Sequence, residues 1–369
     1  MSCPTSPEGD QTDGTDTMSL FYRTGAGLLR RLPAERAHTT TVRLLQGGFG
    51  PRSRQAVGAD LQTRVGGLDL PNPVGLAAGF DKNAQVPDAM LRAGFGFVEC
   101  GTVTPRPQAG NVKPRLFRLP AHEAVINRMG FNNEGLDAFA GRLSVRRGKP
   151  GLVGANLGAN KDSADRIADY LEGLSRLWGL CDYFTVNISS PNTPGLRKLQ
   201  GADEMDELLD RIAQTRRVLA QGGPDYPVFL KVAPDLDEAA VPRVVEQVQT
   251  YGLDAVIVAN TTIDRPDAIG AEWKDVAGGL SGQPLFEKST RLLSHFFEAT
   301  DGQVDLIGVG GVGSADQAYA KIRAGAKAVQ LYSALVFRGP QLVDAINAGL
   351  SERLRADGFS SVSEAVGAG

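Results

Sequence analysis

The chain has 369 residues, enough for one large domain or two ordinary ones, and its apolar fraction of 42% allows a substantial core. A formal net charge of −3 gives no overall signature of nucleic-acid binding. Cys3, Cys100 and Cys181 are too widely spaced for a disulfide framework or a zinc site, which indicates a reduced, intracellular protein. The sequence lacks an apolar run of about 18 residues and a signal-peptide pattern, so we expect neither a membrane span nor secretion.

The first fifty residues divide into two segments of opposite charge. Residues 1–17 carry four acidic and no basic side chains in a Ser/Thr/Asp/Gly/Pro-rich stretch, which predicts a disordered tail. Residues 18–54 carry seven arginines and one glutamate among leucines and phenylalanines, and Pro33 suits the start of a second helix. We therefore expect an amphipathic helical pair over 18–50. It either packs on the main domain or rests on an anionic lipid surface.

From about Leu70 the chain alternates short apolar runs with helical stretches. The predicted strands are Pro73–Gly79, Phe97–Thr104, Leu152–Asn160, Tyr183–Ser189, Val228–Ala233, Ala255–Thr262, Leu306–Val312 and Ala328–Leu335. The predicted helices are 86–93, 133–144, 163–178, 203–221, 237–250, 287–299, 315–324 and 340–355. Eight such units in roughly 290 residues suit an α/β fold of the (β/α)8 TIM-barrel type, over 55–358 and followed by a tail at 359–369. A doubly wound open sheet is the alternative, but no G-x-G-x-x-G follows the first strand.

The predicted strand ends supply lysines, amides, hydroxyls and glycines. They contain no carboxylate pair and no His/Cys cluster, so we do not expect glycosidase chemistry or a metal site. Two connections, 105–131 and 262–285, are too long for simple loops, and on a barrel both follow strand ends at the face that carries active sites. This inventory suits a planar, hydrogen-bonding, anionic cofactor.

Three positions at the strand ends each have two interpretations. Gly310-Gly311 is a phosphate cradle or a tight turn, and its place after the seventh strand favours the phosphate. Lys231 projects from a buried strand, where it would face an anion or form an internal ion pair. Lys82 lies in a Gly-rich turn and would bind a substrate carboxylate or lie on the surface.

The fourth predicted strand ends in Asn187-Ile-Ser-Ser-Pro-Asn-Thr-Pro194, which places two amides and three hydroxyls at one spot. Pro191 and Pro194 hold this loop in extended or turn geometry. Taken alone, the segment is best explained as a satisfied turn. At the mouth of a barrel, however, one of its hydroxyls becomes a candidate proton-transfer group.

Motifs along the chain resemble the dihydroorotate dehydrogenases. They are Gly75–Lys82, Gly101–Gln108, Asn127–Asn133, Asn187–Arg197, Asn260–Thr262, Gly278–Gly282 and Gly308–Gly311. The resemblance runs from about residue 19 to about residue 350 and is closest to the membrane-associated, quinone-using class 2. Class 1 relatives have a cysteine where this chain has Ser190, and they lack the N-terminal helical pair. The family binds FMN in its barrel and oxidises dihydroorotate to orotate in the synthesis of pyrimidines (UMP).

The resemblance implies a role for each matching position. Ser190 would take a proton from C5 of the substrate while a hydride passes from C6 to the flavin, and Thr193 is a candidate relay partner. The implied substrate-binding residues are Lys82, Asn127, Arg128, Met129, Gly130, Phe131, Asn187, Asn192, Asn260 and Thr261. The implied FMN-binding residues are Ala78, Gly79, Thr102, Asn156, Asn187, Lys231, Ala259, Gly282, Gly311, Tyr332 and Ser333. Lys231 would stabilise negative charge on the reduced ring, and Ala259 stands where relatives often have Ser or Thr.

The resemblance also implies a quinone tunnel between the helical pair and the barrel. Its candidate lining is Phe21, Leu28, Leu29, Val42 and Leu45. Residues 19–46 would then rest on an anionic membrane, at the cytoplasmic side of the cell membrane, and a monomer is favoured. Two alternatives remain open: a soluble class 1 enzyme that uses fumarate or NAD, and a non-catalytic phosphate-binding or membrane-docking barrel without flavin.

Overall fold

The structure, a computed structural model, describes residues 27, 29, 31–53 and 55–369. The predicted acidic tail and most of the first helix of the N-terminal pair lie outside the described residues. In the described part, parallel strands close into a barrel in the order β3-β4-β7-β8-β9-β10-β12-β13, and β13 pairs with β3. These strands are β3 (Val74–Leu76), β4 (Phe97–Val103), β7 (Leu152–Leu157), β8 (Tyr183–Asn187), β9 (Val228–Val232), β10 (Ala255–Val258), β12 (Asp305–Val309) and β13 (Ala328–Leu331). Each predicted run supplies one strand, so the barrel is confirmed and the open sheet is wrong.

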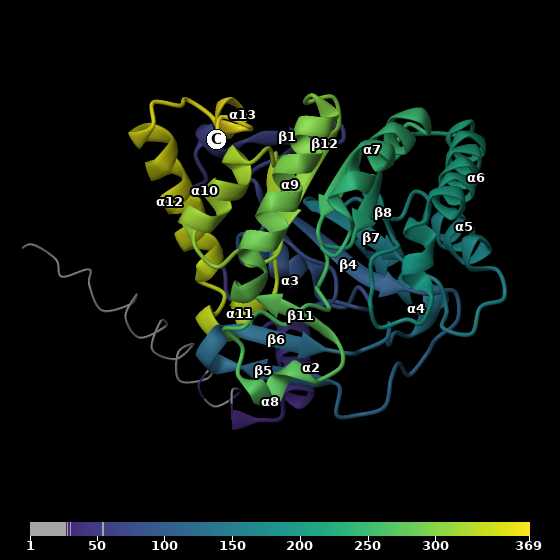
Figure 1. Cartoon of the computed structure of the whole chain (residues 1–369), viewed down its shortest axis with the longest axis horizontal. Coiled ribbons are helices and arrows are strands. Elements are labelled where there is room, and N and C mark those ends of the chain that lie inside the picture. The colour runs from purple at the N-terminus through teal and green to yellow at the C-terminus, as the bar shows by residue number, and fades with distance from the viewer. Residues whose placement is uncertain (1–26, 28, 30, 54) are drawn as a thin grey trace, which may run out of the picture.

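Helices between the strands form an outer layer around the barrel (Figure 1). They are α3 (Pro87–Arg92), α4 (Gly135–Arg146), α5 (Arg166–Leu177), α6 (Ala202–Ala220), α7 (Val241–Thr250), α9 (Phe286–Thr300), α10 (Ala315–Arg323) and α12 (Leu342–Ala356). The eighth strand is shorter than predicted, because it ends at Leu331 and a short helix, α11 (Ser333–Arg338), begins two residues later. This helix lies at the barrel end where the site is built.

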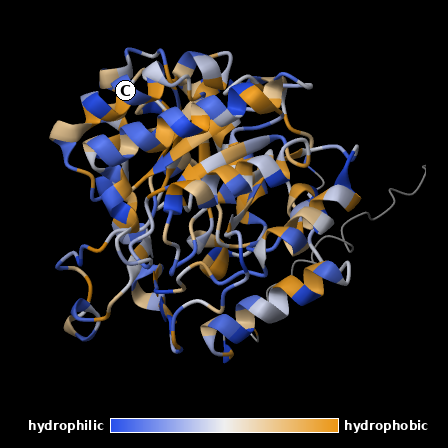
Figure 2. Cartoon of the chain, turned by 90° about the vertical axis from the view of Figure 1, so that its right-hand side faces the viewer, coloured by the Kyte–Doolittle hydropathy of each residue, from blue (hydrophilic) through white to orange (hydrophobic). Residues whose placement is uncertain are grey.

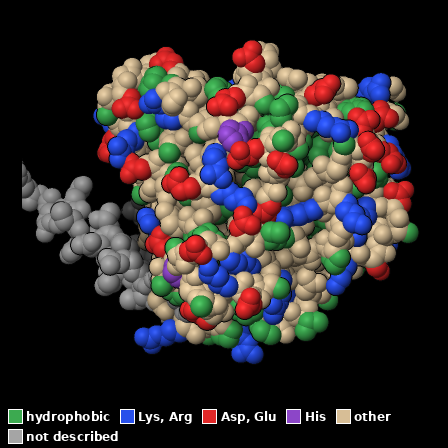
Figure 3. Space-filling view, viewed as in Figure 1, with side chains coloured by type: hydrophobic (Ala, Val, Ile, Leu, Met, Phe, Trp, Pro, Cys, Tyr) green, Lys and Arg blue, Asp and Glu red, His purple; other side chains and the backbone are tan. Residues whose placement is uncertain are grey.

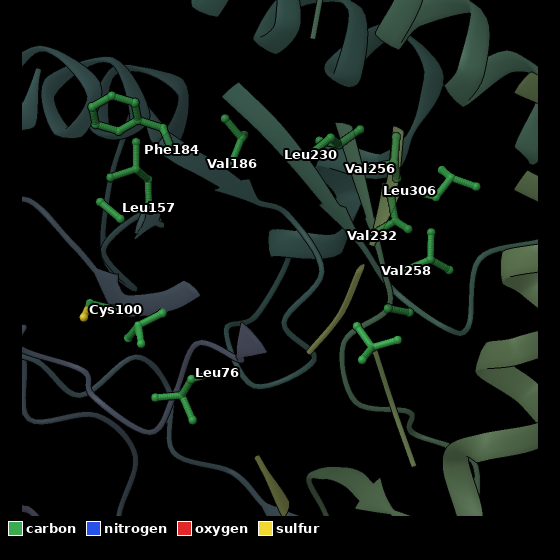
Figure 4. Close-up of a cluster of buried hydrophobic side chains, with 14 of the residues drawn as sticks. Leu76, Cys100, Leu157, Phe184, Val186, Leu230, Val232, Val256, Val258 and Leu306 are labelled. Carbon is green, nitrogen blue, oxygen red and sulfur yellow. The ribbon is translucent and has the colours of Figure 1, made fainter. Parts of the chain in front are cut away.

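The barrel wall buries apolar side chains on both of its sides. In Figure 2 the strands are mostly orange, whereas the surrounding helices alternate between orange and blue. Alternation along a strand sends successive side chains to opposite sides. One set packs against the helices, and Figure 4 shows part of it, including Leu76, Val186, Leu230, Val256 and Leu306. The other set fills one end of the barrel interior with Phe97, Tyr183, Phe229, Ile257 and Ile307.

That apolar end of the interior is closed by a hairpin of β1 (Thr63–Val65) and β2 (Leu68–Leu70), whose Val65 and Leu70 join the same cluster. Large rings fit inside because glycines face them. A Cβ at Gly154 would collide with the ring of Tyr183. The described side chains therefore pack this end of the interior, and the cavity described below lies at the opposite, carboxyl end of the strands.

The two long connections build a small antiparallel sheet over that carboxyl end. β5 (Leu116–Leu119) and β6 (Ala124–Asn127) come from the first connection, and β11 (Gly279–Gly282) and the short helix α8 (Ala271–Lys274) come from the second. Figure 1 shows this sheet together with α8 and α11, at the end of the molecule opposite α13 and the C-terminus.

The second helix of the predicted pair is present as α2 (Ala34–Gln46), and it packs against β5. Pro33 precedes its first residue and Gly47 follows its last, as the sequence predicted. Glu35 near its start accepts hydrogen bonds from Arg115 Nη2 at 2.7 Å and Nε at 3.3 Å, which ties α2 to the segment before β5. The helix thereby becomes one wall of the region above the strand ends.

The residues expected to form a C-terminal tail, 359–369, instead belong to the packed domain. They contain α13 (Val362–Ala365), and the side chains of Val362 and Ala365 are fully buried. The backbone N–H of Gly367 donates to the carbonyl of Ile322, and that of Gly369 to the carbonyl of Arg323. The two buried apolar side chains anchor this segment to the barrel domain.

Candidate active site

A cavity of about 560 Å³ lies between the strand ends, the small sheet and α2. Its volume is in the usual range of small-molecule sites. The barrel side of its wall is rich in amides, hydroxyls and glycines. The α2 side is mostly apolar and includes Leu29, Ala37, Leu44, Leu45 and Phe49. A single space therefore joins a polar compartment to an apolar one.

Most of the predicted cofactor positions line this cavity. They are Ala78, Gly79, Thr102, Asn187, Lys231, Ala259, Gly282, Gly311, Tyr332 and Ser333. The exception is Asn156, which is fully buried behind the wall. Its Nδ2 donates to Glu99 Oε1 at 2.7 Å, and its Oδ1 accepts from Asn187 Nδ2 at 3.0 Å. Asn156 thus fixes the orientation of a residue in the wall rather than forming the wall.

Most of the predicted substrate positions also line the cavity: Lys82, Asn127, Met129, Gly130, Phe131, Asn187, Asn192, Asn260 and Thr261. Arg128 does not. Its guanidinium donates to the carbonyl of Pro114 at 2.8 Å and lies over the ring of Phe117, 5.1 Å from the centroid. Its side chain is therefore directed onto the small sheet, and only its neighbours in sequence reach the cavity.

Ser190 and Ser189 are adjacent but occupy different environments. Ser189 Oγ donates to Asn187 Oδ1 at 2.6 Å and accepts from Asn260 Nδ2 at 2.8 Å, so its hydroxyl is fully used. Ser190 is 5% exposed, lines the cavity, and accepts a hydrogen bond from the Asn192 N–H at 3.2 Å. Among the described residues nothing accepts the Ser190 proton. Ser190 is thus the serine whose O–H is available to a ligand.

Thr193 lies close to Ser190 in sequence but not in the cavity wall. It is buried, and its Oγ1 has no hydrogen-bond partner within the described part of the chain. The loop that carries both residues is held by Arg197, whose Nε donates to the carbonyl of Ser189 and whose Nη2 donates to the carbonyl of Thr261. An unsatisfied buried hydroxyl behind a cavity-lining serine is compatible with a relay, and its role stays a prediction.

Glu99 is a site residue that the sequence analysis missed. Its side chain is fully buried in the barrel interior, where it lies 3.6 Å from Lys231 Nζ and accepts hydrogen bonds from Asn156, Gln330 and Thr185. Lys231 therefore forms the internal ion pair of one interpretation and also lines the cavity; that it faces an anion there stays a prediction. The available signal was a single charged residue within the otherwise uncharged strand Phe97–Val103.

Lys82 has a different electrostatic setting. Its Nζ donates to the carbonyl of Gly79 at 2.6 Å. Burial lowers the pKa of Lys82 to about 8, and Arg115 adds to this effect, while Glu35 and Asp81 oppose it. A cation held under these conditions gains from an anionic ligand, because the ligand would replace the hydration lost on burial.

His38 of α2 also lines the cavity, although nothing in the sequence singled it out. Its Nδ1 lies 3.4 Å from Tyr332 Oη, and its ring meets that of Phe80 edge to face with centroids 5.5 Å apart. Burial lowers the pKa of His38 to about 3, and the Lys82 charge contributes, so the imidazole is neutral at physiological pH. His38 lies where the polar and apolar compartments meet.

Backbone from β11, the turn after β12 and the start of α11 lines the cavity where the sequence predicts a phosphate cradle. Gly311 has a φ of +75°, and a Cβ there would lie 2.6 Å from Phe286 Cα. Gly282 has a φ of +94°, and a Cβ there would lie 2.8 Å from Ala124 Cα. Ser333 Oγ donates to Ser281 Oγ at 2.8 Å. The bare backbone and two hydroxyls that line the cavity here fit a phosphate group.

The cavity wall also fits the planar, hydrogen-bonding part of such a cofactor. Gln330 Oε1 and Thr261 Oγ1 are buried, line the cavity and have no partner within the described residues. Unsatisfied buried polar atoms are rare in folded proteins, so these two indicate ligand atoms at the same place. The ammonium of Lys231 reaches the same space.

The predicted quinone-tunnel residues separate into three groups. Leu29 and Leu45 line the apolar side of the cavity. Val42 does not, because it faces the main core instead. Phe21 and Leu28 lie outside the described residues. Among the described helices none is long and apolar enough to cross a membrane.

The fold and the site define a (β/α)8 barrel with a cavity at the carboxyl ends of its strands, which is where enzymes of this fold carry their active sites. The dihydroorotate dehydrogenase family model matches residues 60–354, and the chain belongs to this family. It is 52% identical to the dihydroorotate dehydrogenase (quinone) of Parvibaculum lavamentivorans over 92% of this chain and 96% of that protein. It is also 52% identical to the enzyme of the same name from Xanthobacter autotrophicus, over 92% of this chain and 96% of the relative.

Solved structures of the family have the same fold. DHODH from Eimeria tenella, in complex with ferulenol, superposes with a TM-score of 0.86 at 38% identity, covering 90% of this chain and 95% of that one. Its ligand-free form gives the same TM-score at 39% identity. The resemblance inferred from the motifs, including its placement in the quinone-dependent class 2, is therefore confirmed.

Proposed function

We propose that this chain oxidises (S)-dihydroorotate to orotate with FMN as the hydride acceptor and a membrane quinone as the terminal electron acceptor. The observation that carries the proposal is the single cavity in which the predicted substrate and cofactor positions adjoin and which continues beneath α2. Its polar compartment would hold substrate and flavin, and its apolar compartment would admit a quinone. Because the two compartments are parts of one cavity, dihydroorotate and the quinone could react with the same flavin.

The cofactor would be held at both of its ends. Backbone around Gly282 and Gly311, with Ser333, would bind the phosphate, and Asn187 and Lys231 would face the ring. When bound, FMN supplies the acceptor for the hydride. The Lys231 cation, which lies 3.6 Å from Glu99, would stabilise negative charge on the reduced ring.

The substrate would be oriented by one cation and several amides. The Lys82 ammonium would pair with the carboxylate, since a buried lysine gains most from an opposite charge. Asn127, Asn192 and Asn260 would bind the polar edges of the ring. Two of them are already aligned, because Asn192 Nδ2 donates to Asn127 Oδ1 at 3.1 Å.

Ser190 would accept the proton from C5, while the hydride leaves C6 and the C5=C6 double bond forms. A serine hydroxyl is a poor base in water, so the site has to stabilise its alkoxide or remove its proton in the same step. The Asn192 N–H already donates a hydrogen bond to Ser190 Oγ at 3.2 Å. This hydrogen bond would become stronger as negative charge develops on the oxygen. The unpartnered hydroxyl of Thr193 would serve as the next proton carrier.

An acceptor-specificity assay tests the proposal. The purified chain should be yellow with bound flavin and should oxidise dihydroorotate with a ubiquinone analogue, but not with fumarate or NAD. Turnover supported only by fumarate or NAD would indicate the class 1 alternative. A colourless protein that stays colourless after FMN is added would indicate a non-catalytic barrel.

A further inference from the structure

Lys321, in the last turn of α10, is a fully buried lysine without an ion-pair partner among the described residues. Its exposed fraction is 0%, and no carboxylate of the described residues lies within ion-pair distance. Its Nζ donates to Ser289 Oγ at 2.9 Å and to Thr290 Oγ1 at 3.0 Å, and lies 5.3 Å from the centroid of the Phe286 ring. Lysines are almost never fully buried unless they are paired, so a negative partner is missing.

This ammonium lies directly behind the phosphate cradle. Ser289 Oγ, which accepts from Lys321, lies 3.1 Å from the carbonyl of Gly310 and 3.1 Å from that of Phe286, and its one proton serves these two acceptors. The aliphatic part of Lys321 runs along β12, where a Cβ at Gly308 would lie 3.0 Å from Lys321 Cδ. One hydroxyl therefore separates the buried cation from a glycine that lines the cavity.

We propose that Lys321 is a positioning residue of the phosphate site, whose buried charge balances a phosphate dianion bound at Gly310 and Gly311. The interaction passes through the Ser289 hydroxyl and through a protein interior that screens charge weakly. The proposal rests on the proposed function, because the phosphate of FMN is the anion. It assigns the counter-charge of the cradle to a residue that does not touch the cofactor.

Proton binding is a consequence of this arrangement. Burial lowers the pKa of Lys321 to about 7, and Glu287 of α9 is the charged neighbour that opposes the shift. At pH 8 the lysine of the empty site is therefore mostly neutral. A dianion in the cradle favours the charged form and raises the pKa, so binding of FMN at pH 8 should take up about one proton.

The first test compares FMN with riboflavin, which has the same ring but no phosphate. The full-length chain would be stripped of flavin, and the dissociation constants of both flavins would be measured by fluorescence quenching. We expect Lys321→Met and Lys321→Gln to weaken FMN binding about tenfold and to leave riboflavin binding unchanged. The glutamine variant retains a group that can hydrogen bond to Ser289 but has no charge. If it binds FMN as the wild type does, the charge is irrelevant and the proposal is wrong.

Lys327→Met is the matched control. Lys327 directly precedes β13 and pairs with Asp305 at 2.5 Å, at the end of the strands opposite the cavity. The substitution removes the same charge from the molecule as the Lys321 variants do. Its ratio of FMN to riboflavin affinity should equal that of the wild type. An equal loss of FMN affinity in this control would assign the effect to net charge and overturn the proposal.

A second test needs no substitution and remains decisive if the variants fail to fold. Calorimetric titrations of the wild-type chain at pH 8, in two buffers of different ionisation enthalpy, report the protons taken up. FMN should take up about one proton more than riboflavin. Any change in the protonation of Lys82 should be the same for both flavins, so it cancels in the difference between their proton uptakes. Equal uptake would refute the role of Lys321, whereas a chain that binds neither flavin would refute the cofactor assignment itself.

Discussion

Two lysines reach the cavity, and their surroundings assign them different tasks. Lys231 lies 3.6 Å from the buried Glu99, so it has an ion-pair partner inside the protein. Within the described part of the chain, Lys82 has the carbonyl of Gly79 as its only hydrogen-bond acceptor, and burial lowers its pKa to about 8. Lys82 can thus lose its charge within the working pH range of an enzyme, and substrate affinity should report this loss.

We predict that dihydroorotate and orotate bind more weakly as the pH rises through 8. Below this pH Lys82 is charged and pairs with the ligand carboxylate, and above it the neutral amine cannot. From pH 7 to pH 9 the dissociation constant of orotate should rise roughly tenfold. This dissociation constant would be measured by adding orotate and following the absorbance of the bound flavin. In Lys82→Arg, which stays charged, the pH dependence should vanish; if it persists, another group is responsible.

Substitutions of the two serines and the threonine in the 187–194 loop should differ in their effects on the stability of the fold and on the activity. Ser190→Ala should retain flavin and lose most of its reduction by dihydroorotate. Thr193→Val should slow the same step without destabilising the fold, because the hydroxyl it removes is buried without a partner. Stopped-flow experiments would measure the rate of flavin reduction, and thermal unfolding would measure the stability. Normal reduction in the valine variant would exclude the relay.

Ser189→Ala provides the contrast to these two variants. It removes two hydrogen bonds, to Asn187 and from Asn260, and should lower stability by about 1–3 kcal/mol. A stability loss in Thr193→Val as large as this would mean that its hydroxyl has a structural partner.

At the scale of elements, the cradle depends on the close packing of β12 against the first turn of α9. Gly311→Ala should lower the flavin content and the melting temperature, because the new Cβ would lie 2.6 Å from Phe286 Cα and the residue has a φ of +75°. Gly313→Ala in the same turn is the matched control. Its Cβ would meet no atom closer than 3.4 Å, so flavin content should be unchanged. Equal effects in the two variants would disprove this account.

The strand order and most strand-end residues could be predicted because the barrel is built from local units. Each apolar run is one strand, and parallel strands bring their carboxyl ends to one face. The sheet of β5, β6 and β11 could not, since β6 pairs with β11, a segment about 150 residues later in the chain. Glu99 was missed for a similar reason. Its partners come from other strands, so its buried charge is satisfied only after the barrel closes.

Asn156, Arg128 and Val42 show the other limit of prediction from sequence. Each lies beside residues that line the cavity, yet each side chain points elsewhere: into the barrel wall, onto the small sheet or into the core. A motif places the backbone at a site, but the direction of a side chain depends on its tertiary neighbours. These three positions therefore support the site rather than form its surface.

At the scale of the whole molecule, the cavity opens among exposed apolar side chains at the α2 end. Phe49 is 74% exposed and Leu44 is 42% exposed, and both also line the cavity. Arg36 and Arg43 of α2 are exposed nearby in sequence. Elsewhere, on the face shown in Figure 3, acidic and basic side chains are interspersed. Exposed apolar side chains with basic neighbours are the combination that suits binding to anionic lipid. Leu44 and Phe49 also line the cavity, so an apolar acceptor would enter past them.

We predict that Leu44→Ser combined with Phe49→Ser weakens binding to vesicles that contain anionic lipid. Exposed side chains of this size contribute about 1.5–3 kcal/mol each on full burial, so partial insertion of the two predicts roughly a tenfold loss. Turnover with a vesicle-borne quinone should fall in parallel, whereas reduction of a water-soluble dye should not. Val218→Ser is the control, because Val218 is an apolar side chain on α6 that is 65% exposed, and the change should alter neither vesicle binding nor turnover. Unchanged vesicle binding in the double variant would place the membrane contact elsewhere on the molecule, and a loss of dye reduction would show that the rim also supports the flavin site.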